Sequence, residues 1–175
     1  MAKITIFGWV GTGKTSVGKE LAKRFNYDFI SSGNIFRAEA ESLGIGMHEL
    51  EELYNQDPER DKNLDNKMAE YGQTHNNFIA DSRLAWHFIP DSIKIKLVAE
   101  TDERARRVAE REGISLAAAK HDITFREEVC QKRYQEVYGL TTIAPDNIFD
   151  LIIDTTQLNF AEVVDKVETF LKPKI

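Results

Sequence analysis

The stretch GWVGTGKTS, residues 8–16, brings together residue types that can hold the phosphates of a nucleotide. The spacing G-x-x-x-x-G-K-[ST] is matched there by Gly8, Gly13, Lys14 and Thr15. Glycines in this pattern let backbone N–H groups curl around phosphate oxygens at the start of a helix, while the lysine reaches the outer phosphates and the hydroxyl helps to hold magnesium. We therefore predict a site for a nucleoside triphosphate and Mg²⁺, formed by Gly8, Gly11, Thr12, Gly13, Lys14, Thr15 and Ser16.

The loop alone does not identify a reaction, because molecular switches, motors and kinases all use it. Trp9 lies at a variable position of the loop. Its side chain could stack on a nucleotide base, or it could pack against the protein or be exposed at the surface. The sequence favours packing or surface exposure over stacking.

Charged side chains elsewhere in the chain could act on the same phosphates. Asp81 follows the apolar run 78–80, so at the end of a strand its carboxylate could orient magnesium through water, and Arg83 could approach the phosphates. Arg126 and Arg133 are seven residues apart. On a helix such a spacing places two side chains within about 20° of each other, so both could serve one site. Their positive charge would suit the negative charge that spreads over a phosphoryl group during transfer.

The elements that must position these residues follow from the hydrophobic pattern. Short apolar runs predict five strands, at residues 4–7, 27–30, 78–80, 93–97 and 151–153. Amphipathic helices are predicted after the glycine loop, across the polar segment 34–74, over 102–138 with a break at Gly113 and a restart at Ser115, and behind Asn159. Strands that alternate with helices predict an α/β fold with a parallel sheet covered on both faces.

Length, charge and composition indicate which broad class of protein this chain belongs to. A length of 175 residues with 42% apolar residues predicts one globular domain over residues 1–175. A net charge of -6 disfavours nucleic acid as a partner. We find no long apolar segment typical of a membrane span or a signal peptide, and the single cysteine, Cys130, allows no intramolecular disulfide. The four scattered histidines disfavour a histidine metal site. We expect a soluble, cytoplasmic protein that is a monomer or at most a weak dimer.

Four further stretches follow the glycine loop along the chain. They are SSGNIFR at 31–37, DSR at 81–83, R-E-E-x-x-x-x-R-Y-x-x-x-Y-G at 126–139 and FDLIIDTT at 149–156. Over nearly the whole chain this order resembles the cytidylate kinases, and the third stretch resembles those of the archaeal type. The resemblance implies the P-loop kinase fold, a three-layer sandwich with a five-stranded parallel sheet in the order 2-3-1-4-5 and a small helical lid. It also implies transfer of the γ-phosphate of ATP to CMP or dCMP.

The same resemblance implies roles for individual residues. Acceptor binding falls to a region at about residues 31–75 and the lid to about 113–138. Magnesium would be held by Thr15 and Asp81. The acceptor would be bound by Ser32, Gly33, Arg37 and Arg83. The transferring phosphate would be surrounded by the catalytic residues Lys14, Arg37, Arg83, Arg126 and Arg133. The acidic run 48–61 is interpreted as a solvated helix with its exit turn, and no residue that reads the base is assigned in it.

Two departures from the family pattern keep alternatives open. Ser82 stands where the related D-G-R stretch has glycine, and Gln131 stands where a further arginine is expected in the lid. A P-loop kinase for another small acceptor, such as AMP, UMP or a non-nucleotide hydroxyl compound, would keep the loop. A nucleotide-binding regulatory protein with little transfer activity would also keep it.

Overall fold

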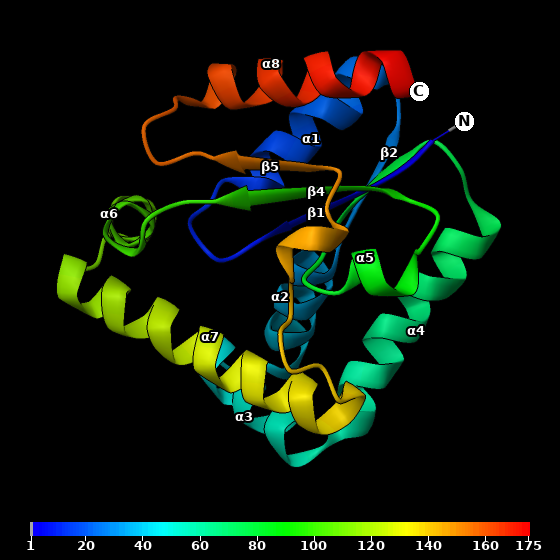
Figure 1. Cartoon of the computed structure of the whole chain (residues 1–175). Coiled ribbons are helices and arrows are strands. Elements are labelled where there is room, and N and C mark those ends of the chain that lie inside the picture. Colours follow the sequence, from blue (N-terminus) through cyan, green and yellow to red (C-terminus); the bar gives the residue numbers. More distant parts are fainter. Residues whose placement is uncertain (1) are drawn as a thin grey trace.

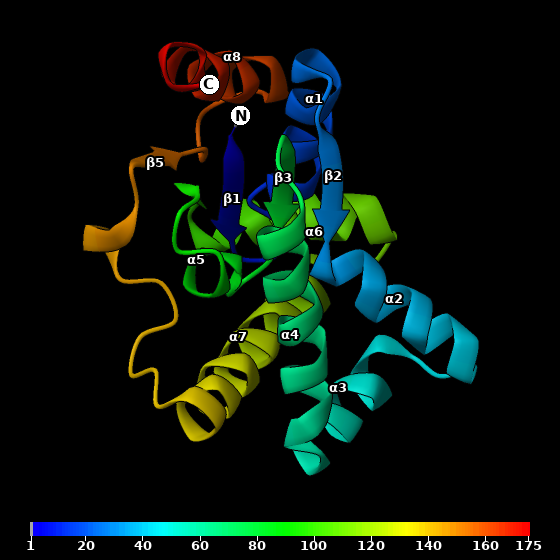
Figure 2. The ribbon, with the colours of Figure 1, turned by 90° about the vertical axis from the view of Figure 1, so that its right-hand side faces the viewer.

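Five parallel strands form the centre of the molecule, in the order β2-β3-β1-β4-β5 (Figures 1 and 2). The computed structural model describes residues 2–175. The strands are β1 (Lys3–Gly8), β2 (Asp28–Ser31), β3 (Phe78–Asp81), β4 (Ile93–Val98) and β5 (Leu151–Asp154). The parallel sheet and its predicted order are confirmed.

Helices connect the strands and cover both faces of the sheet. They are α1 (Lys14–Phe25), α2 (Ser32–Leu43), α3 (Met47–Gln56), α4 (Pro58–Thr74), α5 (Ala85–Phe88), α6 (Thr101–Glu112), α7 (Leu116–Tyr138) and α8 (Phe160–Leu171), with short 3₁₀ turns at Asp146–Ile148 and Lys172–Lys174. The predicted break and restart are confirmed, since Gly113 ends α6 with a φ of 67° and the Ser115 hydroxyl accepts the Ala118 N–H at the start of α7. None of the helices in the described residues is both long and apolar enough to cross a membrane.

Alternation along β1 divides the core into two layers. Ile4 and Ile6 point to one face of the sheet, where α1 and α8 contribute Leu21 and Val164. Phe7 points to the other face. There it packs in the same cluster as Leu84, Trp86, Cys130 and Tyr134, which come from the β3–α5 connection, α5 and α7. Figure 1 shows α1 and α8 together on one side of the sheet and α7 on the other. The second half of α7 is therefore part of the core.

The strand register brings the reactive segments to one edge of the sheet. Ser31, at the end of β2, lies beside Asp81, at the end of β3, and Asp81 lies beside Ile6 of β1. The glycine loop begins directly after β1. Because all the strands are parallel, their carboxyl ends and the loops behind them share this edge, the place where open α/β sheets bind ligands.

The segments predicted to bind the acceptor and to form the lid lie beyond this edge. Residues 32–74 form α2, α3 and α4, and Figure 2 shows α3, α4 and α7 grouped below the sheet. Most of the segment 113–138 is the single helix α7. Movement of this segment as a lid stays a prediction.

Candidate active site

The glycine loop between β1 and α1 is shaped by backbone angles that only glycine adopts without strain. Gly11 and Gly13 both have a φ of 87°. Gly13 is the N-cap of α1 and provides no side-chain cap, so the first N–H groups of the helix remain open to an anion. Thr12 is buried, and its hydroxyl donates to the Trp9 carbonyl at 2.8 Å. The loop is therefore held from within, because both the hydroxyl and the backbone N–H of Thr12 donate to the Trp9 carbonyl.

The predicted triphosphate residues divide into two groups. One pocket is lined by Gly11, Gly13, Lys14, Thr15 and Ser16. Gly8 and Thr12 lie behind the loop, where a Cβ on Gly8 would come within 2.3 Å of Thr12 Oγ1. These two residues shape the loop and do not line the pocket. Trp9 packs edge-on against Phe7, with ring centroids 5.6 Å apart, as the packing interpretation predicts. It also lines the pocket, so stacking on a nucleotide base stays a prediction.

Gly11→Ala is expected to destabilise the loop and weaken nucleotide binding at least tenfold. A Cβ at this position would lie 2.7 Å from the Arg104 carbonyl oxygen, and the φ of 87° is itself unfavourable for alanine. Gly113→Ala is the matched control, because Gly113 has a similar φ of 67° with no atom within 4 Å of the added Cβ. Titration of both variants with a fluorescent ATP analogue measures the difference. Equal affinities would contradict the close packing of the loop against α6.

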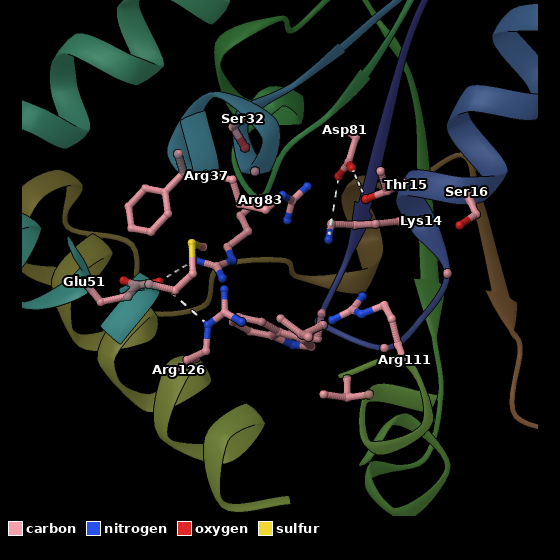
Figure 3. Close-up of a pocket in the computed structure, with 18 of the residues that line it drawn as sticks. Lys14, Thr15, Ser16, Ser32, Arg37, Glu51, Asp81, Arg83, Arg111 and Arg126 are labelled. Carbon is pink, nitrogen blue, oxygen red and sulfur yellow. Dashed lines mark hydrogen bonds and ion pairs between the residues drawn. The ribbon is translucent and has the colours of Figure 1, made fainter. Parts of the chain in front are cut away.

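Lys14, Thr15 and Asp81 meet at the base of the pocket (Figure 3). Thr15 Oγ1 donates to Asp81 Oδ2 at 2.5 Å, and Lys14 Nζ lies 3.7 Å from Asp81 Oδ1. The Ser31 hydroxyl also donates to Asp81 Oδ2, at 3.3 Å. A hydroxyl beside a carboxylate is the oxygen-rich pair that Mg²⁺ prefers, so Thr15 and Asp81 fit the ion predicted for them. Burial lowers the pKa of Lys14, and the surrounding arginines lower it further while Asp81 opposes them.

The other end of the pocket is formed by residues of α2 and by the segment after β3. Ser31 caps α2 by accepting the Asn34 N–H, which leaves Ser32 and Gly33 in the first turn facing the pocket. Arg37 follows one turn later, and its Nη2 donates to Asn34 Oδ1 at 2.6 Å. The residues predicted to bind the acceptor, namely Ser32, Gly33, Arg37 and Arg83, all line the same pocket as Lys14. Their roles in binding stay predictions.

Glu51 of α3 is a site residue that sequence reasoning missed. The residue is only 2% exposed, and its carboxylate lies 2.8 Å from Arg133, 3.9 Å from Arg126 and 4.0 Å from Arg83. Although burial opposes it, the guanidinium groups of Arg83 and Arg133 lower the pKa of Glu51, so the group is an anion among cations. The signal was available in Met47 and Tyr54, which share the face of Glu51 on α3 and mark that face as buried.

The interpretation of residues 48–61 as a solvated helix with its exit turn was therefore wrong for part of the run. The exit turn lies at Asp57, but Glu51 and Asp61 are each only 2% exposed. The apolar faces of α3 and α4 pack against α2. Both carboxylates are buried with these helices, where they form ion pairs with Arg133 of α7.

Arg126 and Arg133 face the same pocket, as their spacing predicted, but they have different surroundings. Arg133 is 5% exposed and is fully engaged, since Nη1 donates to Glu51 at 2.8 Å and Nε lies 2.6 Å from Asp61 Oδ2. Arg126 has no hydrogen-bond partner for its buried Nε within the described part of the chain. Burial lowers the pKa of Arg126, and the charge of Arg83 lowers it further. Arg126 is thus the arginine better placed to meet an anionic ligand.

Two carboxylates of α4 lie one turn apart with unequal surroundings. Burial raises the pKa of Asp61 to about 6 and that of Asp65 to about 7. Asp65 accepts a hydrogen bond from the Tyr138 hydroxyl at 2.6 Å and does not line the pocket. Asp61 does line it.

Neither departure from the family pattern alters the lining of the pocket. Ser82 is buried and turns its hydroxyl to the Leu84 N–H, and its φ lies outside the left-handed region, so no glycine is required there. Gln131 lies on the far side of α7, where its amide nitrogen donates to the Thr141 carbonyl at 3.1 Å and its oxygen accepts the Ile143 N–H. This side chain therefore ties down the segment after α7 and does not line the pocket.

The histidines have packing roles where the structure shows them. His48 stacks on Phe125 with ring centroids 4.8 Å apart, and His75 stacks on Tyr71 at 4.0 Å. In residues 2–175 no cluster of three or more histidine, cysteine or acidic side chains could hold a metal ion.

Comparison with known proteins decides the family. A model of the cytidylate kinase-like family matches residues 3–157. The chain belongs to this family. The cytidylate kinase of Ignicoccus hospitalis is 35% identical over 172 residues, covering 98% of this chain and 99% of that protein. The cytidylate kinase of Halobacterium salinarum is 37% identical over 166 residues, covering 94% and 86% of the two chains.

Solved structures support the P-loop kinase fold of this family member. An uncharacterized protein from Eubacterium ventriosum matches with a TM-score of 0.74 at 17% identity, covering 99% of this chain and 100% of that one. Shikimate kinase from Bacteroides thetaiotaomicron matches with a TM-score of 0.65 at 15% identity, covering 98% of each chain. Family membership makes the protein a nucleoside monophosphate kinase, and hence an ATP-dependent phosphotransferase.

Proposed function

We propose that the protein transfers the γ-phosphate of ATP to CMP or dCMP, with Mg²⁺ as the metal ion. The observation that carries this proposal is one pocket lined by two groups of residues that suit anions. Lys14, Thr15 and the N-terminus of α1 are the first group, and Arg37, Arg83 and Arg126 are the second. One phosphate on the donor and another on the acceptor would account for both groups. Relatives named cytidylate kinase favour a cytidine nucleotide as the acceptor.

The chain's own residues would act by alignment and by charge. The open N–H groups of the loop and the Lys14 ammonium would bind the donor phosphates, while Arg37 and Arg83 would orient the acceptor phosphate in line with them. Arg126, with few anionic partners, would stabilise charge on the group in transfer. Thr15 and Asp81 would hold Mg²⁺, which when bound screens the donor phosphates and orients them. No covalent intermediate on the protein is required.

A panel of acceptors tests the proposal. ADP release from Mg-ATP is measured with CMP, dCMP, UMP, AMP, shikimate and no acceptor, side by side. We expect release with CMP or dCMP at least 100-fold above the rate without acceptor. Fast release with shikimate alone would overturn the nucleotide assignment. Binding of ATP with no acceptor-dependent release would instead support the nucleotide-binding regulatory protein.

The alternative of a nucleotide-binding regulatory protein was suggested by Ser82 and Gln131. Neither residue lines the pocket, so neither supports that alternative. We further propose that the protein acts as a monomer in the cytoplasm on small molecules, without a nucleic acid or membrane partner. Its net charge of -6 supports the first of these exclusions.

A further inference from the structure

The pocket that holds the arginines is also lined by apolar side chains. Phe36, Met47 and Leu64 contribute this apolar surface from α2, α3 and α4. Asp61 contributes a carboxylate from the same turn of α4 as Leu64. Flat apolar surface beside one polar group is the arrangement that a nucleobase needs, since its faces are stacked or packed and its edge is read by hydrogen bonds.

Asp61 is a buried carboxylate of which only one oxygen is engaged by Arg133. It is 2% exposed and lines the pocket, and its Oδ2 lies 2.6 Å from Arg133 Nε. This ion pair leaves Oδ1 as the oxygen that can accept a hydrogen bond from a ligand. Buried polar atoms in folded proteins are nearly always hydrogen-bonded. A donor on the ligand would therefore satisfy the second oxygen of this carboxylate.

Asp65, one turn further along α4, shows what a structural carboxylate looks like in the same helix. It is 3% exposed, but it accepts a hydrogen bond from Tyr138 at 2.6 Å and lies outside the pocket lining. Both aspartates are buried, but only Asp61 lines the pocket, so burial alone does not explain the position of Asp61.

We propose that Asp61 reads the acceptor base by accepting a hydrogen bond from the exocyclic amino group of cytosine, and thereby selects CMP over UMP. This inference rests on the proposed function. A carboxylate is the natural partner of the cytosine amino group, whereas uracil carries a carbonyl oxygen at the same ring position. Two acceptors would then face each other in a buried site, which leaves both without a hydrogen bond and costs binding free energy. Arg133 positions the carboxylate from behind.

The first test changes the substrate and leaves the protein intact. The 5′-monophosphate of the pyrimidin-2-one riboside has the shape of CMP but carries hydrogen in place of the amino group. With the wild-type enzyme at pH 8 we expect kcat/KM for this analogue to be at least 10-fold below that for CMP, because each specific base contact typically provides a discrimination of this order or more. Equal kcat/KM values would overturn the proposal.

The second test uses two isosteric variants. Asp61→Asn replaces an acceptor by a group that can also donate to the uracil oxygen, so the ratio of kcat/KM for CMP to that for UMP is expected to fall at least 10-fold. Asp65→Asn keeps an oxygen for Tyr138 and is expected to leave the ratio unchanged. If Asp61 had a purely structural role, the variant would have a lower kcat/KM for CMP and for UMP by the same factor. The ratio would then stay as in the wild type, which would contradict base reading.

The outcomes separate this inference from the function on which it rests. Suppose that the wild-type enzyme turns over CMP, that kcat/KM is equal for CMP and the analogue, and that Asp61→Asn leaves the CMP-to-UMP ratio unchanged. Base reading by Asp61 is then overturned, and the proposed function stands. If CMP gives no ADP release above the rate without acceptor, both are overturned.

Discussion

Lys14→Ala is expected to lower kcat for ADP formation by about 10²–10³-fold, the range found when one preorganised donor to a developing charge is removed. Lys14 lines the pocket, and its ammonium lies 3.7 Å from Asp81 at the point where the glycine loop ends. Burial lowers the pKa of Lys14, and it also strengthens the attraction of the ammonium group for phosphate, because little water screens the charge. Steady-state assays with saturating Mg-ATP and CMP measure the loss.

Lys23→Ala is the matched control for this variant. Lys23 lies on the same helix, α1, and is exposed outside the pocket lining. We expect its kcat to stay within about twofold of the wild type, since exposed charges far from a site act weakly through solvent. Comparable losses in the two variants would show that Lys14 acts on the stability of α1 and not on the phosphates.

Arg133→Met is expected to lower the free energy of unfolding by about 3–5 kcal/mol, the usual cost of removing one partner from a buried ion pair. Arg133 is the cation between Glu51 and Asp61, both of which are 2% exposed. Without it Asp61 would lose its ion-pair partner, and Glu51 would keep only the more distant guanidinium groups of Arg126 and Arg83, at 3.9 and 4.0 Å. Urea denaturation followed by circular dichroism measures the change. Combination with Asp61→Asn should recover part of the loss, because one of the stranded charges is then absent.

Arg126→Met supplies the comparison on the same helix. Its buried Nε has no hydrogen-bond partner in the described chain, and its nearest carboxylate atoms lie 3.8–3.9 Å away. We expect a stability loss of less than about 1.5 kcal/mol together with a large fall in kcat. An equal loss of stability in both variants would contradict the separate roles assigned to the two arginines.

Much of the fold could be predicted from the sequence because its signals are local. Apolar runs, the glycine at the end of α6 and the caps at Ser115 and Asn159 all act within a few residues. The strand order came from family resemblance, since no local pattern says which strands are neighbours. The roles of the site residues stay predictions, although the structure does gather most of them into one pocket.

The burial of Glu51 and Asp61 could not be predicted from local sequence patterns. Both stand in an acidic run that is typical of a solvated helix, and both are buried. Their burial depends on contacts with Arg133, which is 82 residues from Glu51 along the chain. A single sequence does not specify such a pairing, because hydrophobic periodicity locates the buried face of a helix and not the element that covers it.

The sequence by itself determined the phosphate-binding loop, the alternation of strands and helices and the pair of arginines that share a helix face. These features depend on backbone angles and side-chain spacing within one or two turns, so they are written in consecutive residues. Tertiary structure decided which arginine is engaged by carboxylates, where Gln131 points and which aspartate of α4 reaches the pocket. These outcomes depend on the packing of α3, α4 and α7 against one another, and burial there changes the energy of each charge.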